Sequence, residues 1–125
     1  MRYLEAFILA VVTVFAPAKT ALIAALALVF FDFVTGVLAA RKRKEKITSA
    51  GFKRTVGKMV LYEMALCMAF LAQEFLLGDD VPAFKLISTM IGLVELKSIL
   101  ENLDTINGKP VFRAILKKIT QKQAE

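Results

Sequence analysis

The chain has 125 residues, which is room for one domain. Hydrophobic residues make up 58% and charged residues 22%, in alternating blocks that suit a bilayer better than a soluble core. The net charge is +6, but the basic residues flank apolar blocks, which favours a membrane surface over nucleic acid as their partner. There is no histidine and only one cysteine, Cys67, which excludes histidine-based catalysis, the usual zinc ligand sets and an intrachain disulfide.

The first apolar block, residues 3–16, is shorter than the about 17–25 residues that a comfortable membrane span requires. Two interpretations stay open for it. Arg2 and the small residues Ala16-Pro17-Ala18 resemble the flanks of a cleaved signal peptide. Alternatively the block is a retained short helix that Pro17 ends, and this helix either spans the membrane or lies at its outer surface.

The second block, residues 20–40, has the length of a membrane span, and its only charge is Asp32. The basic segment that follows, residues 41–58, predicts a cytoplasmic loop with a short interfacial helix from about Phe52 onward. The lysines and arginines of this segment are Arg41, Lys42, Arg43, Lys44, Lys46, Lys53, Arg54 and Lys58.

The third block, residues 59–77, is a second span that ends in the acidic turn Gly78-Asp79-Asp80. Pro82 is suited to start the next helix. The fourth block, residues 84–103, is the least apolar and the third candidate span. After the turn Asn107-Gly108-Lys109-Pro110, basic and apolar residues alternate over 111–122.

The alternation over residues 111–122 predicts a basic amphipathic helix on the membrane surface, and a solvated, partly frayed tail is the alternative. The expected fold is therefore all-α: one multi-spanning membrane domain of three to four membrane helices plus a C-terminal basic amphipathic helix. Because positive loops stay inside, we expect the 41–58 segment and the C-terminus in the cytoplasm and the 78–83 turn outside.

Polar residues inside the apolar blocks are costly in lipid and need partners or water. Counted from the basic segment, Asp32 and Glu63 lie in the inner halves of their helices, and Glu95, Ser98 and Asn102 share one face of the fourth block. We expect a packing or functional role for Asp32 and Glu95.

The other carboxylates in these blocks do not require a partner on another helix. Glu101 can pair with Lys97 on its own helix, and Glu63 can lie at the membrane–water interface. Small residues four apart would let helices approach closely. These pairs are Ala21 and Ala25, Gly36 and Ala40, and Ala65 and Ala69.

Three elements, taken in order, resemble a known family. They are Asp32-Phe33-Val34-Thr35-Gly36, then Ser49-Ala50-Gly51-Phe52-Lys53 with Lys58 opening the next helix, and then Glu95-Leu96-Lys97-Ser98-Ile99-Leu100-Glu101-Asn102 before the Gly108-Lys109-Pro110 turn. In order and spacing they are similar to the phage holin family that includes toxin-secretion and phage-lysis holins, over roughly residues 20–115. The motif residues correspond to Asp32, Thr35, Gly36, Ser49, Gly51, Lys58, Glu95, Ser98, Glu101 and Asn102.

The resemblance implies a protein of the bacterial cytoplasmic membrane that is not an enzyme and needs no cofactor. Holins self-associate and permeabilise the membrane at a set time, so that an endolysin reaches the cell wall and the host lyses, and relatives are linked to export of large toxins. The expected partners are further copies of the chain and anionic lipid. The endolysin is a functional partner that requires no direct contact, and no nucleic acid is expected.

The mechanism that we expect starts with polar faces that pair with each other, within or between protomers, and later line or support a watery lumen. The residues concerned are Asp32, Glu95, Ser98 and Asn102. Two rival functions are a small proton-coupled transporter, which would take up substrate without collapsing the membrane potential, and a non-conducting scaffold that anchors a soluble partner through the basic segment and tail.

Overall fold

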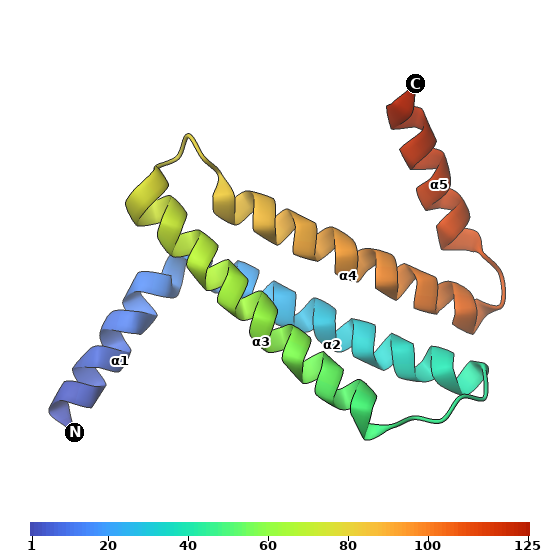
Figure 1. Ribbon diagram of the computed structural model, residues 1–125, viewed down its shortest axis with the longest axis horizontal. Coiled ribbons are helices and arrows are strands. Elements are labelled where there is room, and N and C mark those ends of the chain that lie inside the picture. The colour runs from blue at the N-terminus through green and yellow to red at the C-terminus, as the bar shows by residue number, and fades with distance from the viewer.

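The computed structural model describes residues 1–125 and is built from helices (Figure 1). Three long helices, α2, α3 and α4, pack into a bundle, while α1 and α5 project from its two ends. In chain order the elements are α1 (Arg2–Phe15), η1 (Ala16–Ala18), α2 (Lys19–Lys42), α3 (Ser49–Ala72), η2 (Gln73–Leu77), α4 (Ala83–Asn107) and α5 (Val111–Ala124).

Helices α2 and α4 run parallel, and α3 runs antiparallel to both. Asp32 contacts Ser98, and Gly36 faces Asn102 one turn further along both helices, which fixes the parallel register. The loop after α2, the start of α3 and the turn after α4 therefore lie at one end of the bundle (Figure 1). The turn between η2 and α4 lies at the other end.

Helix α1 leaves the bundle at the short 3-10 turn η1, where Pro17 lacks the N–H that a continuing α-helix needs (Figure 1). No residue of α1 is buried, and only its end is held, by a ring contact between Phe15 and Phe70 with centroids 5.9 Å apart. By length and composition, two helical stretches could cross a membrane, Arg2–Lys42 and Ser49–Leu77. Helix α4 has comparable length, 25 residues, but carries more charge.

The basic segment is more helical than the expected 41–58 loop. Helix α2 continues to Lys42 and α3 begins at Ser49, so only residues 43–48 connect them. Thr48 has an extended backbone at the N-cap position, and the basic residues that follow sit on the exposed surface of a regular helix. Their charge indicated a loop, but lysine and arginine are good helix formers, and charge alone does not end a helix.

A hydrogen bond stabilises the turn at each end of α4. At its start, the Gln73 side-chain oxygen accepts a 2.8 Å hydrogen bond from the Phe84 N–H, which ties the π-helical turn η2 to α4. At its end, Gly108 adopts a left-handed conformation with φ 80°, and its N–H donates to the Asp104 carbonyl. The turn predicted at residues 107–110 is confirmed.

The buried apolar core is small and lies where the three bundle helices meet. Ala25 of α2, Leu66 of α3 and Ile91 of α4 form its centre. Most large apolar side chains point outward instead, including those of α1 and the outer faces of α3 and α4. Such an exposed apolar surface is what lipid would cover.

Candidate functional site

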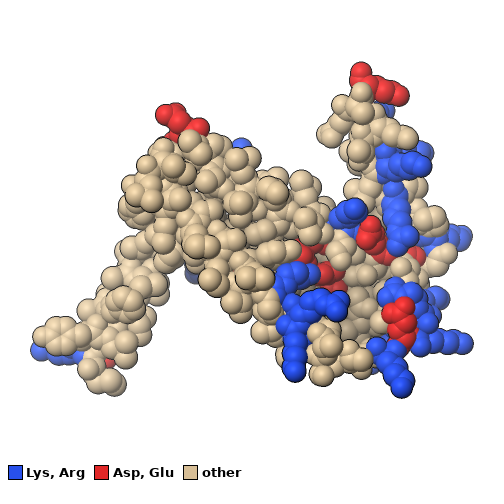
Figure 2. All heavy atoms as spheres, in the orientation of Figure 1, with Lys and Arg blue, Asp and Glu red and all other residues tan.

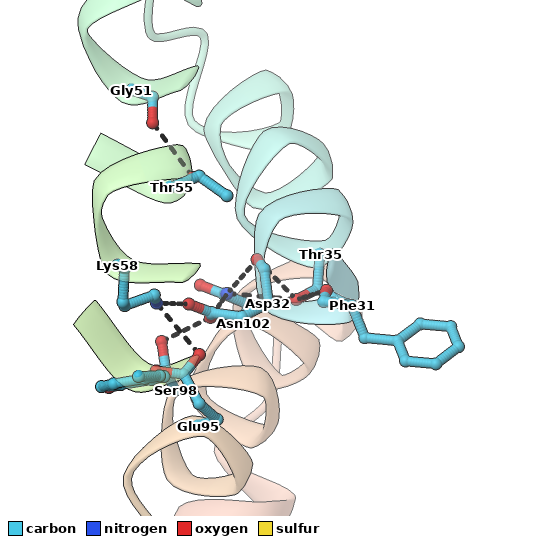
Figure 3. A network of polar contacts seen from close by, with 10 residues as sticks. Phe31, Asp32, Thr35, Gly51, Thr55, Lys58, Glu95, Ser98 and Asn102 are labelled. Atoms are coloured by element: carbon cyan, nitrogen blue, oxygen red, sulfur yellow. Dashed lines mark hydrogen bonds and ion pairs between the residues drawn. The ribbon is translucent and has the colours of Figure 1, made fainter. Parts of the chain in front are cut away.

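A cluster of seven polar side chains links α2, α3 and α4 in the middle of the bundle (Figure 3). We call it the polar cluster; its members are Asp32, Thr35, Lys58, Tyr62, Glu95, Ser98 and Asn102. Its centre is the Lys58 ammonium, which donates to Asp32 Oδ2 at 2.7 Å and to Glu95 Oε2 at 2.9 Å. One lysine on α3 thereby joins carboxylates from the two parallel helices.

Glu95 is the most buried member of the polar cluster, with 1% of its surface exposed. Its second oxygen accepts a 2.8 Å hydrogen bond from the Tyr62 hydroxyl, one turn after Lys58 on α3. Both carboxylate oxygens therefore have a donor. Burial of a carboxylate is tolerated when it is paired and hydrogen-bonded in this way.

Asp32 is held mainly from α4. Its Oδ1 accepts hydrogen bonds from Ser98 Oγ at 2.6 Å and Asn102 Nδ2 at 3.2 Å, while Oδ2 takes the Lys58 ammonium. Asn102 Nδ2 also lies 3.1 Å from Thr35 Oγ1, which itself donates back to the Phe31 carbonyl (Figure 3). The spacing of Ser98 and Asn102 along α4 places both on the face that meets α2.

Gly36 gives Asn102 room to approach α2. A Cβ built on Gly36 would lie 3.6 Å from Asn102 Nδ2, so a methyl group would fit there in ordinary contact. Ala25 and Ala39 of the same helix are also buried. Small residues on α2 thus allow the close approach that the polar contacts need.

The ion pairs of the polar cluster lie well inside the bundle. Asp32 is ten residues before the end of α2, which at 1.5 Å per residue is about 15 Å, and Lys58 is nine residues into α3. The bundle therefore holds a network in which two carboxylates share one ammonium.

The structure brings together five of the predicted polar residues and separates the rest. Asp32, Thr35, Glu95, Ser98 and Asn102 meet in the polar cluster, and Gly36 lies against it. The two other predicted carboxylates stand apart. Glu63 has one buried oxygen with no hydrogen-bond partner, and Glu101 forms no ion pair with Lys97 or any other residue.

Lys58 was expected in the cytoplasmic basic loop and instead reaches into the bundle, because α3 begins nine residues earlier and turns this side chain inward. Arg41, Lys42, Arg43, Lys44, Lys53 and Arg54 are exposed as expected for a basic surface. Figure 2 shows that most lysine and arginine atoms gather at this end of the bundle and over α5. The Arg43 guanidinium donates two hydrogen bonds to Glu45 and lowers the pKa of that carboxyl.

Two contacts of the bundle have no signal in the sequence pattern. In the sequence Tyr62 is one more residue of an apolar block, and only the structure shows that its hydroxyl donates a hydrogen bond to Glu95. Asp104, 4% exposed, accepts hydrogen bonds from the Phe112 and Arg113 N–H groups, both at 2.8 Å. It therefore caps the start of α5 from the last turn of α4, in the way a carboxylate satisfies free N–H groups at a helix start.

Comparison with known protein families finds a match over residues 9–123 to the bacteriophage holin family. The chain belongs to the bacteriophage holin family. The match includes all three bundle helices, and with them every residue of the polar cluster. Searches of curated proteins and of solved structures find no match.

Holins as a family permeabilise membranes and are not enzymes. In this holin no group of three or more potential metal-ligating side chains converges. The polar cluster is an interhelical contact that joins α2, α3 and α4 through hydrogen bonds and ion pairs.

Proposed function

We propose that this holin accumulates in the bacterial cytoplasmic membrane, self-assembles there and permeabilises the membrane so that an endolysin, or a large toxin, can cross. The observation that carries the proposal is the polar cluster in an otherwise apolar bundle of a holin-family chain. Charge in the middle of a lipid-facing bundle is costly, and ionisable residues inside membrane helices typically mark functional sites.

In the proposed topology, α2, α3 and α4 all cross the membrane. Helix α4 is the least apolar of the three, but its Glu95 is turned inward and paired with the Lys58 ammonium, which Asp32 shares. The basic end of the bundle would face the cytoplasm, because positive residues stay inside, and the acidic turn at 78–82 would face out. Helix α1 would lie along the outer surface, since it leaves the bundle at that end (Figure 1).

The polar cluster would act in two arrangements. In the single chain its groups face one another, which makes the bundle acceptable to lipid. In the assembled state the same groups would turn toward water, because a watery lumen can replace the hydrogen bonds that the helices give one another. Permeabilisation would then follow when α3 separates from α2 and α4 and the two carboxylates lose Lys58.

Self-association would use charges that the single chain leaves without partners. Glu63 has an unsatisfied buried oxygen, and Lys97 is exposed on α4 without an ion pair. Side chains tilt toward the start of their helix. Because α3 and α4 are antiparallel, Glu63 and Lys97 tilt toward the same depth from opposite sides. A pair between Glu63 of one copy and Lys97 of the next would satisfy both.

Helix α5 would rest on the cytoplasmic face of the membrane. Asp104 caps its first turn and fixes where it starts relative to α4. Its lysines and its apolar residues Ile115 and Ile119 are exposed, as suits a helix that meets anionic headgroups and the acyl boundary together.

The test is to express the chain in bacteria and follow membrane potential, dye entry and cell lysis with and without a cytoplasmic endolysin. A holin collapses the potential at a set time, and lysis follows only when the endolysin is present. A proton-coupled transporter would keep the potential, and a scaffold would capture a soluble partner without any leak.

A further inference from the structure

A groove between α2 and α3 opens at the basic end of the bundle. It has a volume of about 330 Å³ and is walled by Phe33 and Val37 of α2, Ile47 of the connecting loop, and Gly51 of α3. Gly51 leaves open space at the edge of the groove, since a Cβ placed on it would meet no atom within 4 Å. We call this space the α2–α3 groove.

The groove combines an apolar wall on α2, formed by Phe33, Val37 and Ala40, with polar and charged residues of the connecting loop and of α3. Lys46 and Arg54 line it, both are exposed, and neither forms an ion pair. The one carboxylate at the rim, Glu45, is already held by Arg43 at 2.7 Å. Two cations without ion-pair partners therefore lie beside an apolar wall, which is the pattern that complements an anionic amphiphile.

The groove fits within one leaflet of a bilayer. Its wall on α2 runs from Phe33 to Ala40, which is seven residues or about 10 Å, against about 15 Å for half of a hydrocarbon core. At its deep end the rings of Phe33 and Phe52 meet with centroids 6.1 Å apart. A ligand here would have its charged end at the basic end of the bundle and its apolar end against Phe33.

We propose that the α2–α3 groove binds one anionic phospholipid, with the headgroup phosphate between Lys46 and Arg54 and an acyl chain along Phe33 and Val37. Arginine and lysine are the side chains that hold phosphate in proteins, and each basic residue near an anionic membrane surface adds to lipid affinity. The proposal is independent of pore formation, since it concerns the folded single chain.

The experiment is native mass spectrometry of the full chain in detergent, titrated with phosphatidylglycerol and, separately, with phosphatidylcholine. We expect one phosphatidylglycerol to bind and phosphatidylcholine to bind about tenfold more weakly. The double variant Lys46→Gln with Arg54→Gln should weaken the binding of phosphatidylglycerol by about tenfold or more. Gly51→Leu, which fills the groove and keeps every charge, should weaken it as well.

The matched control is Lys19→Gln with Lys85→Gln, which removes the same charge from exposed positions at the other end of the bundle. It should bind phosphatidylglycerol like the parent chain. Circular dichroism of every variant checks that the helices are intact; if Gly51→Leu unfolds, Gly51→Val takes its place.

Three results would overturn the proposal. The first is equal binding of phosphatidylglycerol and phosphatidylcholine, or a control variant that binds phosphatidylglycerol as weakly as the groove variants do. Either outcome would mean that the lipid is attracted by the overall positive charge and not by the groove. The second is unchanged binding by a folded groove-filling variant. The third is displacement of the lipid by inorganic phosphate or by a second copy of the chain, which would make the occupant a free anion or a protein.

Discussion

The Lys58 ammonium lies 2.7 Å from Asp32 Oδ2, and the same ammonium lies 2.9 Å from Glu95 Oε2. The lysine is thus the only cation between two carboxylates that sit on separate, parallel helices. Removing it would leave both carboxylates facing each other in the middle of the bundle. Lys58 is thus the one side chain that forms ion pairs with both α2 and α4.

Lys58→Met should destabilise the folded bundle by about 3 kcal/mol, because an unpaired buried charge costs far more than its pair gains. Denaturation of the purified protein in mixed micelles, followed by circular dichroism, measures the loss. Lys53→Met on the exposed side of α3 is the control and should change stability by less than about 0.5 kcal/mol. Equal stability of the Lys58→Met variant and the parent chain would show that the ion pairs do not hold the bundle.

Substitutions at Gly36 should depend on size. Gly36→Ala should be tolerated, because a methyl group 3.6 Å from Asn102 Nδ2 is in ordinary contact. Gly36→Leu should cost about 1–3 kcal/mol by pushing α4 away from α2. The same denaturation assay gives both values, and a leucine variant that is as stable as the alanine variant would contradict the close approach of the two helices.

Asp104→Ala should free the start of α5 without unfolding the bundle, since it removes both hydrogen bonds to the Phe112 and Arg113 N–H groups. A lost helix cap costs about 1 kcal/mol. Amide hydrogen exchange should rise in α5 and remain unchanged in α3. Unchanged protection of the Phe112 and Arg113 amides would rule out the cap.

Charge reversal tests the proposed contact between copies. Glu63→Lys alone and Lys97→Glu alone should each reduce chemical cross-linking into dimers and larger species, because each puts like charges together. The double variant should restore the cross-linking. Lys85→Glu on the same helix is the control and should have no effect; a double variant no better than either single one would reject the pairing.

Much of this arrangement could be predicted from the sequence, because it depends on local periodicity. Glu95, Ser98 and Asn102 fall on one helical face by spacing alone, and the turn at Gly108 follows from its residue type. That the chain is all helical, with apolar stretches long enough to cross a membrane, also follows from the blocks.

What the sequence could not provide was the partner of each polar group. Lys58 lies in a basic run, and nothing local distinguishes a lysine that turns into the bundle from one that faces solvent. The start of α3 at Ser49 determines which way Lys58 faces, and the ends of helices are the hardest feature to predict from a sequence pattern. Tyr62 and Asp104 depend on contacts between distant segments, so only the packed structure assigns them.

The central claim is that the polar cluster governs permeabilisation, and the time from induction to collapse of the membrane potential tests it most directly. Asp32→Ala and Glu95→Ala, expressed at the same membrane level as the parent chain, should each shift that time or abolish the collapse. Glu74→Ala, an exposed carboxylate outside the cluster, should collapse the potential on the parent schedule. Unchanged timing in both cluster variants would contradict the claim.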